Sequence, residues 1–160
     1  AMSLAIDREF INRVEYSGLM TPAQLAPPIH SPYYEEALVN AFIEYDPDRA
    51  GSLLDGIGLD QRDDDGMRLL PDGSRLTVYL DYPAFGKRDP AELIAEYQRN
   101  IGLGVSARYR NGRFWYVELD GLALDMGFGA RGGKLNFFVE PQNYVAMDES
   151  HWAGGYGRWY

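Results

Sequence analysis

The feature that most constrains the fold is a strand pattern that lies between two helix patterns, each opening on an Asp-Pro pair. Asp46-Pro47 begins a helix that ends near Gly58, and Asp89-Pro90 begins a second that ends at Gly102. An Asp there can cap free backbone N–H groups, and Pro suits the first helical position. Between the helices, residues 75–82 alternate apolar and polar side chains, as a strand does.

Two more strand patterns follow the second helix, at residues 105–109 and 122–128. Helices and strands therefore interleave along the chain. This order favours an α/β fold, with helices flanking a mixed sheet, over a helical bundle or a β-sandwich. The first helix is expected to bury Ala50, Leu53, Leu54 and Ile57, and Glu92 is placed to complete a capping box in the second.

The N-terminal part of the chain has a helix pattern, then a proline-rich segment. Apolar residues recur every four positions within residues 2–16, at Met2, Ile6, Phe10 and Val14, which predicts an amphipathic helix ended by Gly18. Residues 21–34 hold four prolines and are expected to form an extended loop. A short helix is expected within residues 35–43.

Net charge and composition exclude several classes of function. The chain has 15 Lys and Arg against 24 Asp and Glu, a net charge of −9, so we expect no nucleic-acid partner. The same charge disfavours anionic membrane surfaces, and no apolar run approaches the length of a bilayer span, so we expect no membrane insertion. There is no cysteine, which removes disulfides and thiolate chemistry. The length of 160 residues fits a single domain, 1–160.

Residues 135–160, the last part of the predicted domain, are rich in aromatic side chains. They either pack loosely on it or form an interface with a neighbour, because so many aromatics cannot all remain on a free surface.

The sequence offers few residues for catalysis or for a cofactor, and we expect neither. Residues 60–66 partly match a calcium loop, but the ligands fall short and a solvated hairpin loop is favoured. His30 and His151 lie far apart, which argues against a metal site. Glycines at 127–133 follow a strand without opening a helix, so a dinucleotide site is rejected. We expect these glycines to let a ligand or a second backbone approach closely.

Several stretches, taken in order, resemble the family 5 extracellular solute-binding proteins, the oligopeptide- and dipeptide-binding components of ABC importers. The opening A-M-S-L-A-I-D-R-E looks like the family's A-L-S-x-A-I-D-R helix, and D-x-D-G-x-R, P-D-G and L-T-V look like its hairpin and following strand. The similarity continues through residues 16–24, 45–59 and 92–105, and the order and spacing hold over residues 1 to about 130.

The resemblance implies a fold, a location and a role. The fold would be part of a type II periplasmic-binding-protein lobe, and the chain would be a fragment, the core of the second lobe. The full protein would be periplasmic or extracellular, either free or anchored through lipid at an N-terminal part that this chain lacks, and would pass its solute to ABC permease subunits. It would not be an enzyme.

The resemblance also implies where a solute would lie, in the cleft between two lobes. From this lobe the contacts would come from the loop after the first strand and from the segment after the last, namely Tyr82, Pro83, Phe85, Phe128, Gly129, Ala130 and Arg131. Peptide-binding members place an aspartate in the second segment, and residues 128–133 have none. The solute is therefore left open between an oligopeptide and an oligosaccharide. Tyr82 fits either the cleft or the core.

The secondary structure after the strand at residues 105–109 is ambiguous in the sequence. Asn111-Gly112 is a hairpin signature, whereas the family pattern implies a short helix at residues 113–119, which we expect because tertiary context overrides local propensity.

The main alternative function is a stand-alone acidic interaction or immunity-type protein that binds a basic partner. A small hydrolase would need a perturbed acid pair, which the sequence does not reveal.

Overall fold

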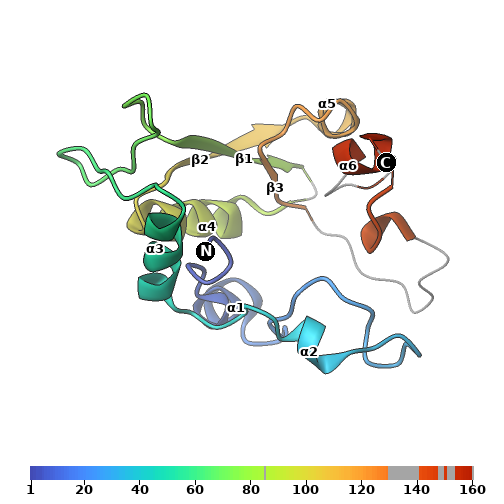
Figure 1. Ribbon diagram of the computed structural model, residues 1–160. Helices are drawn as coiled ribbons and strands as arrows, with labels where there is room; N and C mark the ends of the chain where they lie inside the picture. The colour runs from blue at the N-terminus through green and yellow to red at the C-terminus, as the bar shows by residue number, and fades with distance from the viewer. Residues whose placement is uncertain (85, 130–140, 148–149, 151–153, 160) are drawn as a thin grey trace.

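The computed structural model describes residues 1–84, 86–129, 141–147, 150 and 154–159 (Figure 1). The elements follow one another along the chain as helices α1 to α6, strands β1 to β3 and one 3-10 turn, η1. They are α1 Arg8–Tyr16, α2 Glu36–Val39, α3 Pro47–Gly56, β1 Thr77–Pro83, α4 Arg88–Asn100, β2 Gly104–Arg110, α5 Gly112–Asp120, β3 Met126–Gly127, η1 Pro141–Asn143 and α6 Gly154–Trp159. No helix in these described ranges has the length and apolar character that crossing a membrane requires.

The described strands form one parallel sheet in the order β2-β1-β3. Tyr82 of β1 stands beside Tyr109 of β2, and Leu80 of β1 stands beside Met126 of β3. Parallel neighbours need a crossover, and α4 supplies it between β1 and β2 while α5 supplies it between β2 and β3. The predicted α/β fold with flanking helices is therefore confirmed.

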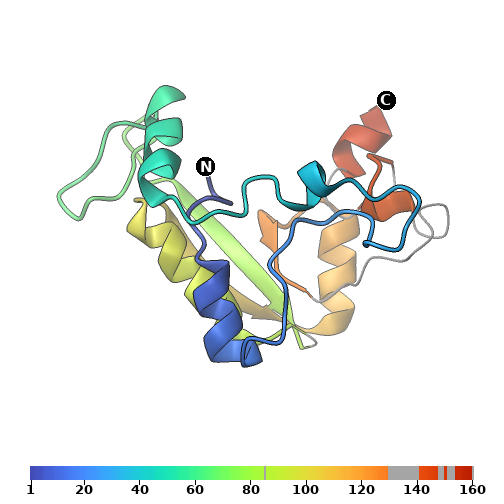
Figure 2. The ribbon, with the colours of Figure 1, turned by 90° about the horizontal axis from the view of Figure 1, so that it is seen from below.

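The core lies on one face of this sheet, between the strands and the layer formed by α4 and the N-terminal segment (Figure 2). Alternate residues of β1 and β2 point into it, together with small residues of α4 that allow the helix to lie close. Its buried members include Leu4, Ala5, Ala50, Leu54, Leu80, Tyr82, Ala91, Ala95, Leu103 and Val105. On α3 the prediction of a wider buried stripe is wrong, because Leu53 and Ile57 are 44% and 73% exposed.

Helices α1 and α3 begin where an aspartate caps them. The Asp46 side chain accepts a hydrogen bond from the Arg49 backbone N–H at 2.9 Å, as the Asp-Pro pair predicts. The apolar repeat predicts a first helix from Met2, but α1 begins at Arg8. The reason is Asp7, whose side chain accepts from the Phe10 N–H at 2.8 Å and so sets the first turn.

The predicted cap of α4 is wrong. The helix begins at Arg88, so Asp89 lies inside its first turn, and Lys87 occupies the capping position without a side-chain hydrogen bond. Glu92, expected to complete a capping box, instead lies 4.0 Å from Arg88 one turn earlier. An aspartate in a first turn still stabilises the helix through its dipole, which explains why the Asp-Pro signal located the helix but misplaced its start.

The conflict at Asn111-Gly112 is resolved in favour of a helix. The Asn111 side chain accepts a hydrogen bond from the Arg113 N–H at 3.0 Å and caps α5. Strand β2, which ends just before Asn111, pairs in parallel with β1 and not with the residues after Gly112, as a hairpin would require. The last predicted strand, residues 122–128, is reduced to the two residues of β3.

The loop expected at residues 60–66 is the first part of a hairpin that spans residues 60–75. Isolated antiparallel bridges join Arg62 to Arg68 and Leu69 to Arg75. The Arg75 guanidinium donates hydrogen bonds to the carboxylates of Asp63 and Asp65. Two of the carboxylates that suggested a calcium loop therefore hold an arginine.

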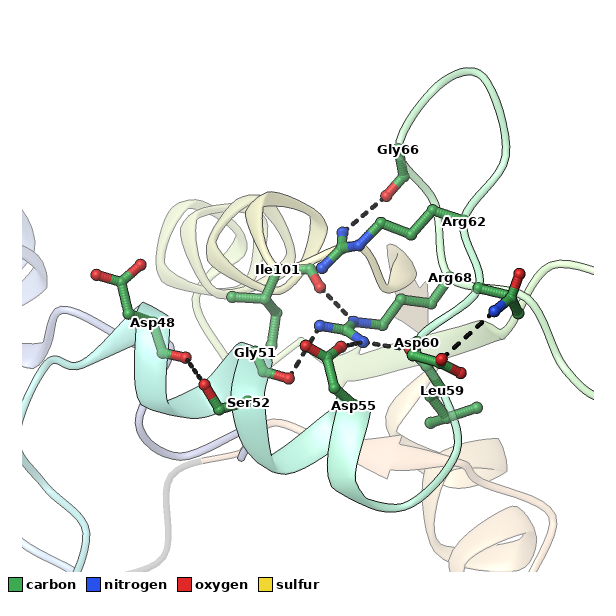
Figure 3. Close-up of polar contacts among 11 residues, drawn as sticks. Asp48, Gly51, Ser52, Asp55, Leu59, Asp60, Arg62, Gly66, Arg68 and Ile101 are labelled. Carbon is green, nitrogen blue, oxygen red and sulfur yellow. Dashed lines mark hydrogen bonds and ion pairs between the residues drawn. The ribbon is translucent and has the colours of Figure 1, made fainter.

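At the base of this hairpin, the guanidinium of Arg68 is completely buried (Figure 3). It donates to the carbonyls of Ile101 at 2.8 Å, Gly51 at 3.1 Å and Leu59, and to the carboxylate of Asp55. Ile101 is the C-cap of α4, and the other three acceptors belong to α3 or the loop that follows it. One side chain thus ties the hairpin to the ends of two helices.

Candidate functional site

Strands β1, β2 and β3 run in the same direction, so their carboxyl ends lie at one edge of the sheet. In open α/β sheets this edge is where ligands bind, because loops leaving neighbouring strands diverge there and leave a crevice. Of the residues predicted to contact a solute, Tyr82 and Pro83 end β1 and the others follow β1 or β3, and these two strands are neighbours in the sheet. The topology therefore brings the two predicted segments to one place.

At the end of β1, the predicted residues are buried. Tyr82 is 8% exposed and its ring meets the ring of Tyr109 edge-to-face, with the ring centres 6.0 Å apart. Pro83 is fully buried. Within this chain, Tyr82 therefore belongs to the core. The sequence had left open whether it belongs to the cleft or to the core.

Beyond β3, the chain stays close to the turn that follows β1. The N–H of Phe128 donates to the Asp81 carbonyl at 2.8 Å, which extends the pairing past the last residue of β3. Gly86, whose N–H donates to the Pro83 carbonyl at 2.8 Å, has no room for a side chain: a Cβ there would lie 2.8 Å from the Phe128 carbonyl oxygen. The two segments thus touch through backbone.

The predicted residues differ in what they offer to a ligand. Phe128 is half-buried and packs against the core, and Gly129 is exposed. Phe85, Ala130 and Arg131 lie outside the described residues. The structure therefore brings Pro83 and Phe128 together, while contact of any of the seven with a solute stays a prediction.

The opposite face of the sheet holds a charged cluster that the sequence analysis missed. Asp81 is fully buried and accepts hydrogen bonds from Arg108 at 2.9 and 2.8 Å and from Arg110 at 3.0 Å. Arg110 also lies 3.2 Å from a carboxylate oxygen of Glu118 on α5. Hydrogen bonding to Asp81 raises the pKa of the Arg108 guanidinium. Two carboxylates balance two arginines, so the cluster is suited to hold β1, β2 and α5 together rather than to transfer a proton.

A signal for this cluster was present in the alternation of the strands. Strand periodicity placed Asp81 on the polar face of β1, and Arg108 and Arg110 lie two residues apart on the next strand. In the observed register Asp81 stands directly beside Arg108. The burial could not be foreseen from β1 alone, because it depends on α5 covering that face.

Helix α5 is seated on β3 by a close contact with a glycine. Trp115 is 6% exposed, and a Cβ added to Gly127 would lie 2.7 Å from the Cη2 atom of its ring. The sequence predicts that the glycines after β3 admit a ligand or a second backbone. For Gly127 the group that approaches is a side chain of this chain.

Metal ligands do not converge in the part of the chain that the structure describes: no three His, Cys, Asp or Glu side chains there are placed to hold an ion. His30 is exposed in the proline-rich loop, and His151 lies outside the described residues.

The end of the described chain packs near α5. A Cβ on Gly155 of α6 would lie 3.1 Å from Leu122, just after α5. Tyr156 and Trp159 of the same short helix remain 57% and 76% exposed. Whether residues 135–160 as a whole are loosely packed stays a prediction.

Comparison with solved structures finds close likeness to solute receptors. An oligopeptide-binding protein, OppA, is 31% identical over 99% of this chain, with a TM-score of 0.86. A mannohexaose-bound periplasmic oligopeptide-binding protein from Thermotoga maritima is 22% identical over 98% of the chain, with a TM-score of 0.72. NikA from Brucella suis, in complex with Fe(III)-EDTA, is 18% identical over 98%, with a TM-score of 0.66. The last two likenesses show the fold alone.

This chain spans 25%, 32% and 31% of the lengths of those three proteins, respectively. No curated protein matches the sequence. The family model for bacterial extracellular solute-binding proteins, family 5, matches residues 1–152. Proteins of this family bind solutes rather than transform them. With that match and the 31% identity to OppA, the chain belongs to the family 5 bacterial extracellular solute-binding proteins.

Proposed function

We propose that this chain forms one wall of the solute cleft of an ABC-importer receptor that works outside the cytoplasm. The wall is the carboxyl edge of the sheet, where the turn after β1 and the segment after β3 meet. The observation that supports the proposal is the close approach of Gly86 to the Phe128 carbonyl, because it sets the two loops against each other at the edge where α/β sheets bind ligands.

The solute we propose is an oligopeptide or an oligosaccharide. The 31% identity to an oligopeptide-binding protein supports a peptide. The lack of an aspartate at residues 128–133, together with the aromatic Phe128, supports a sugar, whose apolar faces stack on aromatic rings. Delivery to ABC permease subunits follows from the family, and a lipid anchor stays a prediction. Family membership favours this receptor over the stand-alone acidic interaction protein.

Substitution of an exposed glycine tests the wall. Gly129 is exposed beside Phe128, and Gly129→Trp is expected to fill the cleft edge and abolish solute binding. Gly56→Trp is the matched control, because Gly56 is exposed at the end of α3 and a Cβ there would have no neighbouring atom within 4 Å.

Calorimetric titration of the longest natural form of the protein supplies the measurement, with a casein hydrolysate in one series and mixed manno-oligosaccharides in the other. Binding of one probe that Gly129→Trp removes and Gly56→Trp preserves would support the proposal. Equal binding by both variants would contradict it.

A further inference from the structure

One lysine joins the turn after β1 to the end of α1. Lys87 stands between Gly86 and the first residue of α4, and its ammonium donates a hydrogen bond to the Glu15 carbonyl at 3.3 Å. The same ammonium lies 4.3 Å from the centre of the Tyr16 ring. Figure 2 shows the end of α1 beside the carboxyl end of β1. These contacts of Lys87 with Glu15 and Tyr16, the Lys87 strap, reach the turn that we propose contacts solute.

Both groups that the Lys87 ammonium meets are suited to a cation. Glu15 lies in the last turn of α1, where carbonyls lack intrahelical donors and the helix dipole is negative. The Tyr16 carbonyl accepts from the Leu19 N–H at 2.9 Å, whereas the donor to the Glu15 carbonyl among the described residues is Lys87. The face of an aromatic ring also attracts a cation. Lys87 thus caps the C-terminus of α1 from another part of the chain.

Lys87 is poorly suited to the helix that it precedes. It occupies the N-cap position of α4 with an extended backbone, and its side chain makes no hydrogen bond to that helix. Ser, Thr, Asp or Asn would cap α4 there, and a cation beside the positive end of a helix dipole is unfavourable. The lysine therefore serves α1 at the expense of α4. Such departures from a local rule are expected at functional sites.

The turn after β1 is held from two sides. On one side Gly86 lies against the Phe128 carbonyl, whose oxygen would be 2.8 Å from an added Cβ. On the other side the Lys87 strap reaches α1. The Gly86 N–H also donates to the carbonyl of the fully buried Pro83 at 2.8 Å, which closes the turn on itself. Because α1 packs on α4, the strap holds the turn against a pair of helices and not against another loop.

We propose that Lys87 is a positioning residue for solute binding, which holds the turn after β1 against α1 in the arrangement that meets the solute. The proposal rests on the proposed function, because that function assigns the turn to the cleft. A turn without the strap would have to become ordered when the solute binds, and this ordering costs binding free energy. Loss of the strap should therefore weaken binding although every group that contacts the solute is unchanged.

Four variants separate positioning from direct contact. Lys87→Met removes the charge and keeps the apolar stem, and Lys87→Arg keeps a cation that can donate and stack. Tyr16→Leu removes the ring on α1. Arg13→Met is the matched control, because Arg13 is an exposed cation of α1 that lies 5.8 Å from the centre of the Phe10 ring, and its loss changes the net charge as Lys87→Met does. Calorimetric titration of the longest natural form of the protein, with the casein hydrolysate and the manno-oligosaccharides, gives the apparent Kd, and thermal melts check folding.

The expected apparent Kd rises about fivefold for Lys87→Met, which is about 1 kcal/mol, and about threefold for Tyr16→Leu. Lys87→Arg and Arg13→Met should stay within about twofold. Lys87→Met/Tyr16→Leu should bind no more weakly than Lys87→Met, because both changes break one strap. Equal Kd values for Lys87→Met and Arg13→Met would overturn the proposal. Normal binding by Tyr16→Leu beside weak binding by Lys87→Met would overturn it too, because Lys87 would then contact the solute itself.

Hydrogen exchange without solute separates this proposal from the proposed function. The Gly86 N–H, bonded to the Pro83 carbonyl, reports opening of the turn. Lys87→Met should speed its exchange at least about threefold, and Arg13→Met should leave it unchanged. Faster exchange in a protein that binds neither probe would refute the receptor function and still support the strap. Unchanged exchange in Lys87→Met would overturn the proposal whatever the solute does.

Discussion

Replacement of Arg68 by Met is expected to destabilise the protein by about 3 kcal/mol, because the buried guanidinium is the shared donor to four acceptors. Met keeps much of the apolar volume of the arginine stem and removes every donor. The substitution thus isolates the polar role of Arg68 from its packing.

The magnitude follows from the burial of each acceptor. The carbonyl of Ile101, a residue 4% exposed, loses a bond from a charged donor, which costs roughly 1.5–3 kcal/mol. Gly51 and Leu59 are half-buried, so water replaces part of what their carbonyls lose, at roughly 0.5–1 kcal/mol each. The Asp55 side chain is 52% exposed, and solvent screens its pair with Arg68 to below about 1 kcal/mol.

Urea unfolding followed by circular dichroism measures the effect, with Arg62→Met as the matched control. Arg62 is exposed in the same hairpin and donates only to the Gly66 carbonyl among described atoms, at 2.9 Å, so its loss should cost about 0.5 kcal/mol or less. Arg68→Lys keeps the charge but cannot span four acceptors, and should fall between the two. Equal unfolding free energies for Arg68→Met and Arg62→Met would refute the reasoning.

Three further substitutions test other contacts. Gly127→Ala should destabilise the protein by about 1–3 kcal/mol and shift the fluorescence of Trp115, whose ring lies 2.7 Å from the added Cβ; an unchanged melt would contradict the contact. The Ser74 hydroxyl and N–H hold the pKa of Asp72 below its ordinary 3.8, so this contribution to stability is complete above pH 3.8 and is lost as the pH falls through the lower folded value. In a carboxyl titration by NMR, Ser74→Ala should return that pKa toward 3.8, and no movement would refute the cause. Asp81→Asn should lower the unfolding free energy by about 2–3 kcal/mol, since it weakens a buried acceptor of two arginines, and urea unfolding should detect the loss.

The sequence located the helices and strands better than it located their ends. Asp46 both marks and caps α3, so signal and structure agree. At α4 the same Asp-Pro pair lies one residue inside the helix, because proline is tolerated throughout a first turn and does not fix which residue is the cap. At Asn111-Gly112 the local chemistry suits a hairpin. The helix forms because β2 pairs in parallel with β1, which lies about 27 residues earlier in the chain and is not visible in the local pattern.

The candidate site was predictable only as far as the two segments that would supply it, one after the first strand and one after the last. Alternation placed Tyr82 on the apolar face, and its burial follows from that, but alternation cannot say whether an apolar face lines a cleft or a core. The contact of Gly86 with Phe128 could not be predicted, because it depends on β3 pairing beside β1. On α1 the apolar repeat misled in the other direction: a regular stripe predicts burial, and Val14 stays 51% exposed.

The most direct test of the central claim is hydrogen exchange of the longest natural form of the protein, with and without the casein hydrolysate or the manno-oligosaccharides. We expect one of these probes to slow exchange in the segments after β1 and β3, including Gly86 and Phe128, while the hairpin at residues 60–75 exchanges as before. Binding of a probe that protects other segments and leaves these two unchanged would show that the carboxyl edge of this sheet is not the wall of a solute cleft.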